Sequence, residues 1–354
     1  MPADQALPAS LGHRLVHRLA HRLGRKLGLS GEMRAEAGDM LDATRGIETR
    51  LGSLEARLGA IEAHLGATEA HLRATAARLA ALEEFSHGSR ATYMGSGLVL
   101  LKAVVHGRTI AYLVEADDRL IAPWFIASGQ YETELTDFFA TTLRHDDHCL
   151  DVGANFGYFT CLFARFCPQG RIVGIEADER LFNILRDNIH INGFGGHATA
   201  WQNAACESER MVQLHRRIGR SGNTSITRLP DEFIASLGEQ PSEAFLVAGV
   251  TVDAAVTHWN GRLDVMKVDV EGAEPLVCQG AAAAIAANPQ LQIVMEWSPG
   301  QIVAAGFDIG EFLDALAAMG MGFHGLGPGR PVIGRDALLG MDYAAGILIT
   351  KQPR

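Results

Sequence analysis

A small glycine-rich turn follows an apolar strand pattern at residues 150–157, which read L-D-V-G-A-N-F-G. Gly153 and Gly157 let the backbone approach a ligand closely, and a helix pattern begins directly after them. A strand, a tight turn and a helix N-terminus in this order are typical of a site that holds a nucleotide-like ligand against backbone N–H groups. The competing interpretation is a turn whose glycines serve packing alone.

An acidic residue at the end of the next strand suits the ribose of such a ligand. Glu176 ends the run R-I-V-G-I-E, where a carboxylate accepts hydrogen bonds from two ribose hydroxyls. The turn is not the G-x-G-x-x-G of dinucleotide-binding proteins, because Asn155 stands in place of the second glycine. A ligand without a pyrophosphate fits better. S-adenosylmethionine offers a ribose for Glu176 and an amino-acid end for Asp151.

A third signal is the charged string K-V-D-V-E-G-A-E, which begins at Lys267 and ends another apolar strand. Lys267, Asp269 and Glu271 alternate, so they lie on one side of the chain if it stays extended. Such side chains bind the methionine end of the cofactor, bind a sugar hydroxyl, take a proton or ligate a hard cation. Glu296 ends the following strand, and we expect it near Asp269. Glu274 is typical of an acidic residue in the first turn of a helix.

Strands and helices must alternate to position these residues, and such alternation begins at about residue 135. It predicts an α/β fold with a mostly parallel sheet and helices on both faces. Strand patterns lie at 148–152, 171–176, 197–202, 263–269, 291–296 and 345–350, and helix patterns at 156–167, 179–192, 273–286 and 309–319. Residues 204–260 are interpreted as an insertion, which includes S-G-N-T-S-I-T.

Taken together, these strings resemble the FkbM family of S-adenosylmethionine-dependent methyltransferases. The resemblance rests on D-V-G-A-N-F-G-Y-F-T, I-E-A-D-x-x-L-F-x-x-L-x-x-N-I-x-x-N, N-A-A, T-V-D and, most specifically, K-V-D-V-E-G-A-E. These motifs fall within roughly residues 124–300. The resemblance implies a Rossmann-like seven-stranded methyltransferase sheet. It also implies O-methylation of a hydroxyl of a sugar, glycan or glycosylated metabolite.

Carried over position by position, the resemblance implies a cofactor site and a reacting edge. The residues expected at the cofactor are Tyr131, Glu132, Asp151, Gly153, Ala154, Asn155, Gly157, Tyr158, Phe159, Glu176, Ala177, Asn203, Ala204 and Asp269. Of the reacting edge the resemblance implies Asp269, and the charged string and strand ends described above add Lys267, Glu271 and Glu296 as residues expected to be catalytic. A carboxylate of this set is the expected base, with His215 as an alternative. We assign no metal ligands, but a carboxylate pair that holds a divalent cation stays open.

A heptad pattern over residues 33–83 predicts a long coiled-coil helix. The a positions include Leu51, Leu58, Leu65, Leu72 and Leu79, and the d positions include Ile47, Leu54, Ile61 and Leu82. In a parallel pair the g and e positions match Arg50 with Glu55, Arg57 with Glu62 and Arg78 with Glu83, whereas antiparallel helices would oppose like charges. The pattern therefore favours a parallel homo-oligomer, and leucine at a with isoleucine at d favours a trimer or tetramer. The alternative is a long helix that packs on its own domain.

Two further segments flank this helix. Residues 11–29 repeat H-R-L-x, which is typical of a basic amphipathic helix that binds an anionic membrane surface or an acidic partner; the alternative is docking on its own protein. Residues 85–131 contain short β-rich runs. The expected organisation is a basic segment at 1–30, a coiled coil at 31–84, a β-rich accessory segment at 85–131 and a methyltransferase domain at 132–354.

Composition narrows the class of protein. A formal net charge of −10 disfavours nucleic-acid binding, and the [DN]-P-P-[YF] string of amino-group methylation is absent. The five cysteines are scattered without C-x-x-C spacing, so we expect neither a zinc site nor disulfides. We found no signal-peptide pattern and expect a cytoplasmic protein, with the inner face of the membrane as a peripheral location. The alternative function is a catalytically inactive, nucleoside-binding coiled-coil scaffold.

Overall fold

The structure is a computed structural model, and it describes residues 18–19, 22–28, 30–119, 121–217, 222, 224–228, 234–235 and 240–354. The chain divides into two compact units, residues 1–83 and 84–354. Within the described ranges, no helix combines the length and apolar character that a membrane span requires. The basic pattern at residues 11–29 falls partly outside these ranges, and its partner stays a prediction.

The heptad region forms a single helix, α2 (Gly31–Ser89). Three leucines of its predicted seam, Leu51, Leu58 and Leu65, are 56%, 58% and 59% exposed. The predicted long helix is therefore present, while its pairing with other copies stays a prediction. The helix continues to Ser89, past the expected boundary at residue 84, so the first residues of the segment expected to be β-rich are helical.

A three-stranded antiparallel sheet follows, formed by β1 (Ala91–Gly95), β2 (Leu98–Val105) and β3 (Arg108–Glu115). The next residues form helix α3 (Ile121–Ser128) instead of a further strand. Its apolar run I-A-P-W-F-I-A has no alternation that distinguishes a buried helix from a strand. Tyr112 of β3 and Phe125 of α3 both pack on the ring of Tyr158, at centroid distances of 5.0 and 5.6 Å. The small sheet thereby supports the segment that follows the glycine turn.

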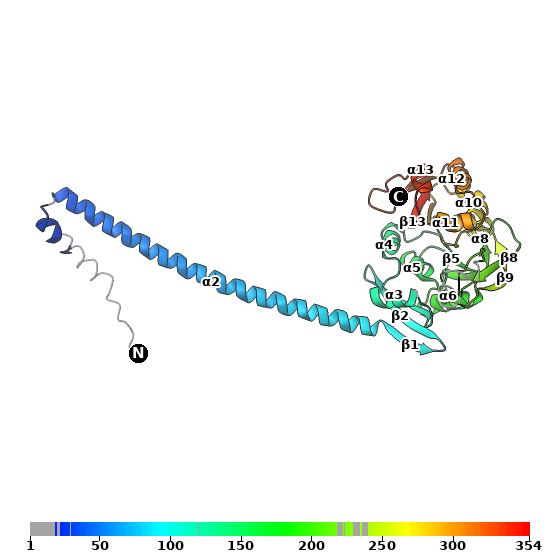
Figure 1. The fold of residues 1–354 in the computed structure, drawn as a ribbon, viewed down its shortest axis with the longest axis horizontal. Helices are drawn as coiled ribbons and strands as arrows, with labels where there is room; N and C mark the ends of the chain where they lie inside the picture. Colours follow the sequence, from blue (N-terminus) through cyan, green and yellow to red (C-terminus); the bar gives the residue numbers. More distant parts are fainter. Residues whose placement is uncertain are drawn as a thin grey trace. The chain divides into compact units, whose positions relative to one another are not determined.

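The larger unit, which contains β5 and β13 as labelled in Figure 1, is built on a mixed sheet. Its seven strands follow the order β12-β13-β11-β10-β4-β5-β6. The strands are β4 (Cys149–Val152), β5 (Ile172–Glu176), β6 (Ala198–Gln202), β10 (Val265–Val268), β11 (Gln292–Trp297), β12 (Gly322–His324) and β13 (Ala344–Thr350). β13 pairs antiparallel with both β11 and β12, and the other neighbouring strands of this sheet pair in parallel. The seven-stranded, mostly parallel sheet expected from the sequence is confirmed. The sequence patterns missed β12, which is too short to show a period.

The strand order reverses at β4. The chain steps outward from β4 to β5 and β6 and then crosses to β10 on the other side of β4. In open α/β sheets, ligands bind outside the carboxyl ends of the strands at such a switch point. The glycine turn after β4 and the acidic string after β10 therefore leave the sheet side by side.

Helices pack on the sheet over two separate apolar cores. Neighbouring residues of a strand enter different cores: Cys149 joins one, and Leu150 joins the other. The helices of this unit are α4 (Thr133–Thr142), α5 (Tyr158–Phe166), α6 (Glu179–Ile191), α8 (Val252–Thr257), α9 (Glu274–Gln279), α10 (Ala282–Ala287), α11 (Pro299–Ala304), α12 (Ile309–Ala318) and α13 (Arg335–Leu339). The helix predicted at 273–286 divides into α9 and α10 near Gly280, where a Cβ would overlap the carbonyl oxygen of Cys206.

The insertion at residues 204–260 contains a second small sheet with the order β7-β9-β8. Its strands are β7 (Ala204–Ala205), β8 (Met211–Arg216) and β9 (Glu243–Val250). A small apolar cluster that includes Val212, Leu214 and Val247 holds it together. Val212 and Leu214 also reach the cavity described below, so the insertion contributes to the site.

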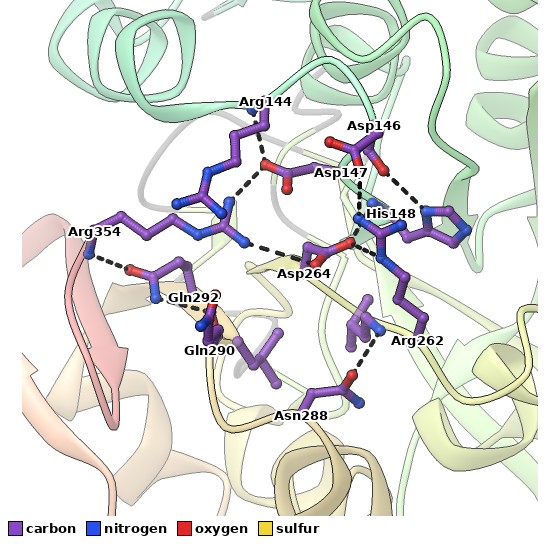
Figure 2. Close-up of polar contacts among 12 residues, drawn as sticks. Arg144, Asp146, Asp147, His148, Arg262, Asp264, Asn288, Gln290, Gln292 and Arg354 are labelled. Atoms are coloured by element: carbon purple, nitrogen blue, oxygen red, sulfur yellow. Dashed lines mark hydrogen bonds and ion pairs between the residues drawn. The ribbon is translucent and has the colours of Figure 1, made fainter.

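A polar network connects the amino ends of the central strands, at the end of the main sheet opposite the carboxyl ends (Figure 2). The Arg354 guanidinium pairs with the carboxylates of Asp147, at 2.6 Å, and Asp264, at 3.7 Å, just before β4 and β10. The Gln292 side chain, at the start of β11, accepts a hydrogen bond from the Arg354 backbone N–H and donates one to Thr350 of β13. Because Asp147 is only 1% exposed, this network fixes the amino ends of the strands.

Candidate active site

A cavity opens at the carboxyl ends of the central strands, where the switch point predicts a ligand. Most of the residues expected from the sequence line it: Tyr131, Glu132, Gly153, Ala154, Asn155, Tyr158, Phe159, Glu176, Ala177, Asn203, Ala204, Lys267, Asp269, Glu271 and Glu296. Asp151 and Gly157 do not line it. The structure thus brings together the glycine turn, the end of β5 and the acidic string.

Glycine is required twice in the turn after β4. Gly153 has a φ of 76°, and a Cβ there would overlap the carbonyl oxygen of Asp269. Gly157 has a φ of 89°, and a Cβ there would overlap the side chain of Leu185. Gly153 therefore lets the ends of β4 and β10 come together, and Gly157 lets α5 begin against α6. Gly157 serves packing, as the competing interpretation of the turn predicted.

Asp151 lies behind the cavity wall and is completely buried. One carboxylate oxygen accepts a hydrogen bond of 2.6 Å from the Thr160 hydroxyl, and the other has no hydrogen-bond partner in the part of the chain that the structure describes. Burial raises the pKa of Asp151, and the charge of Lys267 opposes this rise. The carboxylate is therefore placed to stabilise the buried ammonium group of Lys267.

Lys267 is 5% exposed and reaches the cavity floor. Its ammonium group lies 2.9 Å from a carboxylate oxygen of Asp269 and 5.0 Å from the centroid of the Phe159 ring. Burial alone would lower the pKa of Lys267, but the carboxylates of Asp269, Asp151 and Glu132 raise it above its usual value. Lys267 therefore stays charged, and its ion pair holds the side chain of Asp269 in place.

Asp269, Glu271 and Glu296 form the acidic edge of the cavity, with carboxylate oxygens within 4.8 Å of one another. The extended geometry expected for this string ends at Val268, and Glu271 has a φ of 55°. The turn nevertheless keeps its carboxylate beside Asp269.

Burial and like charge control the protonation of this acidic edge. Burial, and then the charge of Asp269, raise the pKa of Glu271 to about 8 and that of Glu296 to about 9. Glu271 accepts a hydrogen bond from the side-chain amide of Gln301, and Glu296 accepts one of 2.9 Å from the Tyr343 hydroxyl. The other carboxylate oxygen of Glu296 is buried and has no hydrogen-bond partner among the residues with a described structure, so it is able to accept a hydrogen bond from a ligand.

Glu274 belongs to the frame of the site. It begins α9, and one carboxylate oxygen accepts hydrogen bonds of 3.3 Å from the backbone N–H groups of Val270 and Gly272. This role is the one expected for an acidic first-turn residue.

Glu176 ends β5 and faces the cavity. Its carboxylate oxygens accept hydrogen bonds of 2.7 Å from the Asn155 N–H and 2.8 Å from the Asp178 N–H. Burial raises its pKa to about 7, although these two bonds favour the charged form. A carboxylate has about four lone-pair sites, so these bonds leave capacity for the hydroxyls of a ligand.

Comparison with known proteins identifies the family. Residues 151–322 match the family model described as "Methyltransferase FkbM domain". This part of the chain is an FkbM methyltransferase domain. The match covers the glycine turn, Glu176 and the whole acidic edge, and S-adenosylmethionine is the methyl donor of this family.

Three relatives of the FkbM domain show the range of similarity. Methyltransferase sdnD of Sordaria araneosa is 24% identical over 189 residues, which are 44% of this chain and 73% of that protein. The crystal structure of methyltransferase FkbM from Methylobacillus flagellatus is 13% identical, with a TM-score of 0.37 over 62% of this chain and 48% of that one. A TehB-like SAM-dependent methyltransferase from Corynebacterium glutamicum is 11% identical, with a TM-score of 0.35 over 67% and 98% of the two chains. The chain thus spans about half of the crystallised FkbM protein.

Other residues of the FkbM domain site gave no sequence signal. Tyr343 precedes β13, and its contact with Glu296 depends on the antiparallel pairing of β13 with β11. Gln301 lies on α11, a helix too short to predict. Leu276 and Ile226 line the cavity from segments whose apolar residues look like ordinary core positions. His215, the alternative base, lies outside this cavity and lines a second one that also contains Glu271.

Proposed function

We propose that this chain methylates a hydroxyl group of a sugar, glycan or glycosylated metabolite. The observation that carries the proposal is the acidic edge, where three carboxylates converge within 4.8 Å at the cofactor cavity. A hydroxyl needs a hydrogen-bond acceptor and a base as its oxygen becomes a nucleophile, and such an edge supplies both.

The cavity fits S-adenosylmethionine at both ends of that molecule. We assign the ribose hydroxyls to Glu176, whose buried carboxylate faces the cavity with lone pairs to spare. Asn203 and Ala204 border the place for the adenine, with Leu276 beside them. The sulfonium and ammonium groups are cations, and the acidic edge provides complementary charge for them.

The remaining predicted residues would close the cofactor end of the cavity. We assign Tyr131 and Glu132 to this role because both line the cavity just before α4. Glu132 has a φ of 43°, and its backbone is fixed by a 2.8 Å hydrogen bond from the Thr136 N–H to its carbonyl oxygen. Tyr158 and Phe159 form part of the wall.

The reaction we propose is a direct displacement at the methyl carbon. The cofactor supplies an activated methyl group. The hydroxyl oxygen forms a bond to that carbon while the carbon–sulfur bond breaks, and the hydroxyl proton passes to a carboxylate of the acidic edge. Lys267 holds Asp269 in place at 2.9 Å. The protein therefore aligns the hydroxyl and takes its proton.

A divalent cation is the alternative occupant of Asp269, Glu271 and Glu296. Activity that is abolished by EDTA and restored by Mg²⁺ or Ca²⁺ would favour the cation. Activity that is unchanged in EDTA would favour direct proton transfer to a carboxylate.

A labelled-methyl assay tests the proposed function. The chain is incubated with methyl-labelled S-adenosylmethionine and a cell-envelope glycan fraction, and the product is treated with mild alkali. We expect label in an alkali-stable methyl ether and its loss in an Asp269→Asn variant, with Asp314→Asn at an exposed position of α12 as the control. Label in an alkali-labile ester or on nitrogen, or no transfer to any hydroxylated acceptor, would contradict the proposal.

We further propose that α2 assembles the chain into a parallel trimer or tetramer in the cytoplasm, with the basic segment at residues 11–29 directed to the membrane or an acidic partner. The uncovered leucines of the α2 seam support the assembly. The five cysteines are all free and buried, which is compatible with a reducing compartment.

A further inference from the structure

A second cavity of about 130 Å³ adjoins the acidic edge. Glu271 lines both this cavity and the larger cofactor cavity. Gln301, whose amide donates a hydrogen bond to the Glu271 carboxylate, lines the second cavity only. A molecule in the second cavity would therefore meet the reacting edge at Glu271.

The segment 224–227 forms a partition between the two cavities. Thr224 and Ile226 line the cofactor cavity, whereas Ser225 and Thr227 line the second one. This alternation is that of an extended chain, and Ser225 forms an isolated antiparallel bridge with His215 of β8. The Ser225 hydroxyl donates a hydrogen bond of 3.0 Å to the carbonyl oxygen of Glu271, so the partition is anchored to the acidic edge.

Two polar atoms of the second cavity lack partners. The side-chain carbonyl oxygen of Gln301 and the hydroxyl of Ser242 are both buried and have no hydrogen-bond partner among the described residues. Buried polar groups in folded proteins are rarely left unpaired, and those that are deserve an explanation. Hydroxyl groups of a ligand would satisfy both, because a hydroxyl donates to the amide oxygen and either donates to or accepts from a serine.

Apolar and charged groups of the same cavity narrow the ligand class. Ile234 is 1% exposed and, with Ala304, gives the lining an apolar part suited to the C–H face of a sugar ring. Arg217 also lines the cavity, and its charge partly opposes the rise in the pKa of Glu271 that burial causes. Burial, and then the charge of Arg228, lower the pKa of His215, so its imidazole is neutral near pH 7. The combination suits a neutral, polyhydroxylated ring.

We propose that the second cavity is the acceptor subsite and binds the neutral sugar ring that carries, or lies next to, the methylated hydroxyl. This proposal rests on the proposed function, since it assumes that Glu271 faces the reacting hydroxyl. The partition at 224–227 then lies between the sugar ring and the cofactor. The reacting hydroxyl reaches the methyl group of the cofactor at Glu271, which lines both cavities.

Saturation-transfer NMR on the full chain with S-adenosylhomocysteine tests the subsite. The probes are the methyl glycosides of glucose, galactose, mannose and rhamnose. We expect at least one probe to receive saturation, and we expect a Ser242→Ala variant to weaken its binding about fivefold to tenfold, as the loss of one hydrogen bond predicts. Ser242→Phe, which fills the cavity, should abolish it. Ser208→Ala, at an exposed position, is the matched control.

Calorimetry with S-adenosylhomocysteine shows whether each variant is folded and keeps its cofactor site, and we expect an unchanged Kd for both Ser242 variants. Sugar binding that is equal in wild type and Ser242→Phe, or no binding of any probe, would overturn the subsite. Neither result would contradict the proposed function. That function is contradicted only if the labelled-methyl assay shows no transfer of label to a hydroxyl. In the labelled-methyl assay, Ser242→Ala should raise the acceptor KM and leave kcat unchanged.

Discussion

Burial determines the charge of individual carboxyl groups at this site. Glu271 and Glu296 have pKa values of about 8 and about 9, raised from 4.5, because they are buried beside Asp269. Both are therefore largely protonated at neutral pH in the free protein. The positive charge of the cofactor would favour their ionised forms, so binding would prepare the acidic edge to accept a proton.

These raised pKa values predict the direction in which stability depends on pH. The folded protein keeps protons that the unfolded chain releases above about pH 4.5, so the free energy of unfolding falls as pH rises from about 5 to about 9. A Glu296→Gln variant should show a shallower fall. Urea unfolding at several pH values measures this, with Glu179→Gln on the exposed first turn of α6 as the control. Equal slopes in wild type and Glu296→Gln would contradict the assignment.

A Glu176→Gln variant tests the ribose site. The variant replaces one carboxylate oxygen of Glu176 with an NH2 group, which cannot accept a hydrogen bond. In the wild type, the two oxygens accept from the N–H groups of Asn155 and Asp178. We expect affinity for S-adenosylhomocysteine to fall about 10- to 100-fold, the range for losing a charge-assisted hydrogen bond. Calorimetry provides the measurement, and Glu179→Gln should bind like wild type. An unchanged Kd for S-adenosylhomocysteine in Glu176→Gln would contradict the assignment of the ribose hydroxyls to Glu176.

The sequence predicts residues well where spacing along one strand decides their position. Glu176 and Asp269 could be placed at the cavity because each follows an apolar strand whose carboxyl end lies at the switch point. Asp151 also ends a strand, yet its side chain points behind the wall to Thr160, which no pattern reveals. Tyr343 is brought to the site by the pairing of distant strands, so its role could not be read from its neighbours.

At the scale of elements, the long periodic helices and buried strands were predictable, and the short ones were not. The helix pattern at 179–192 matches the observed bounds of α6 within a residue. The start of this helix is fixed by its N-cap residue Asp178, whose side chain accepts a hydrogen bond from the Arg180 N–H. By contrast, α8, α11 and β12 are too short to show a period. Their positions depend on packing against the rest of the domain.

An Arg354→Ala variant tests the network that fastens the amino ends of the strands. It would leave the buried Asp147 carboxylate without its cation, at a cost of about 3–5 kcal/mol. The matched control is Arg335→Ala, whose partner Asp314 is exposed, with an expected cost of about 0.2–1 kcal/mol. Urea denaturation compares the two variants. Equal losses would show that the network does not fasten the sheet.

At the scale of the whole molecule, the exposed seam of α2 predicts assembly. Leu58→Asp with Leu65→Asp places charges at two a positions that are more than half exposed in the single chain. We expect this double variant to sediment as a monomer, whereas the wild type sediments as a trimer or tetramer. The control is Ala56→Asp with Ala63→Asp, at f positions on the opposite face. A wild-type monomer, or an equal effect of both double variants, would contradict the coiled coil.

The most direct test of the whole account is a crystal structure of the chain with S-adenosylhomocysteine. We predict that both ribose hydroxyls lie within hydrogen-bond distance of Glu176 and that the sulfur atom faces the acidic edge at Asp269. A cofactor product bound elsewhere, or one whose sulfur points away from Asp269, Glu271 and Glu296, would contradict the proposed reaction centre.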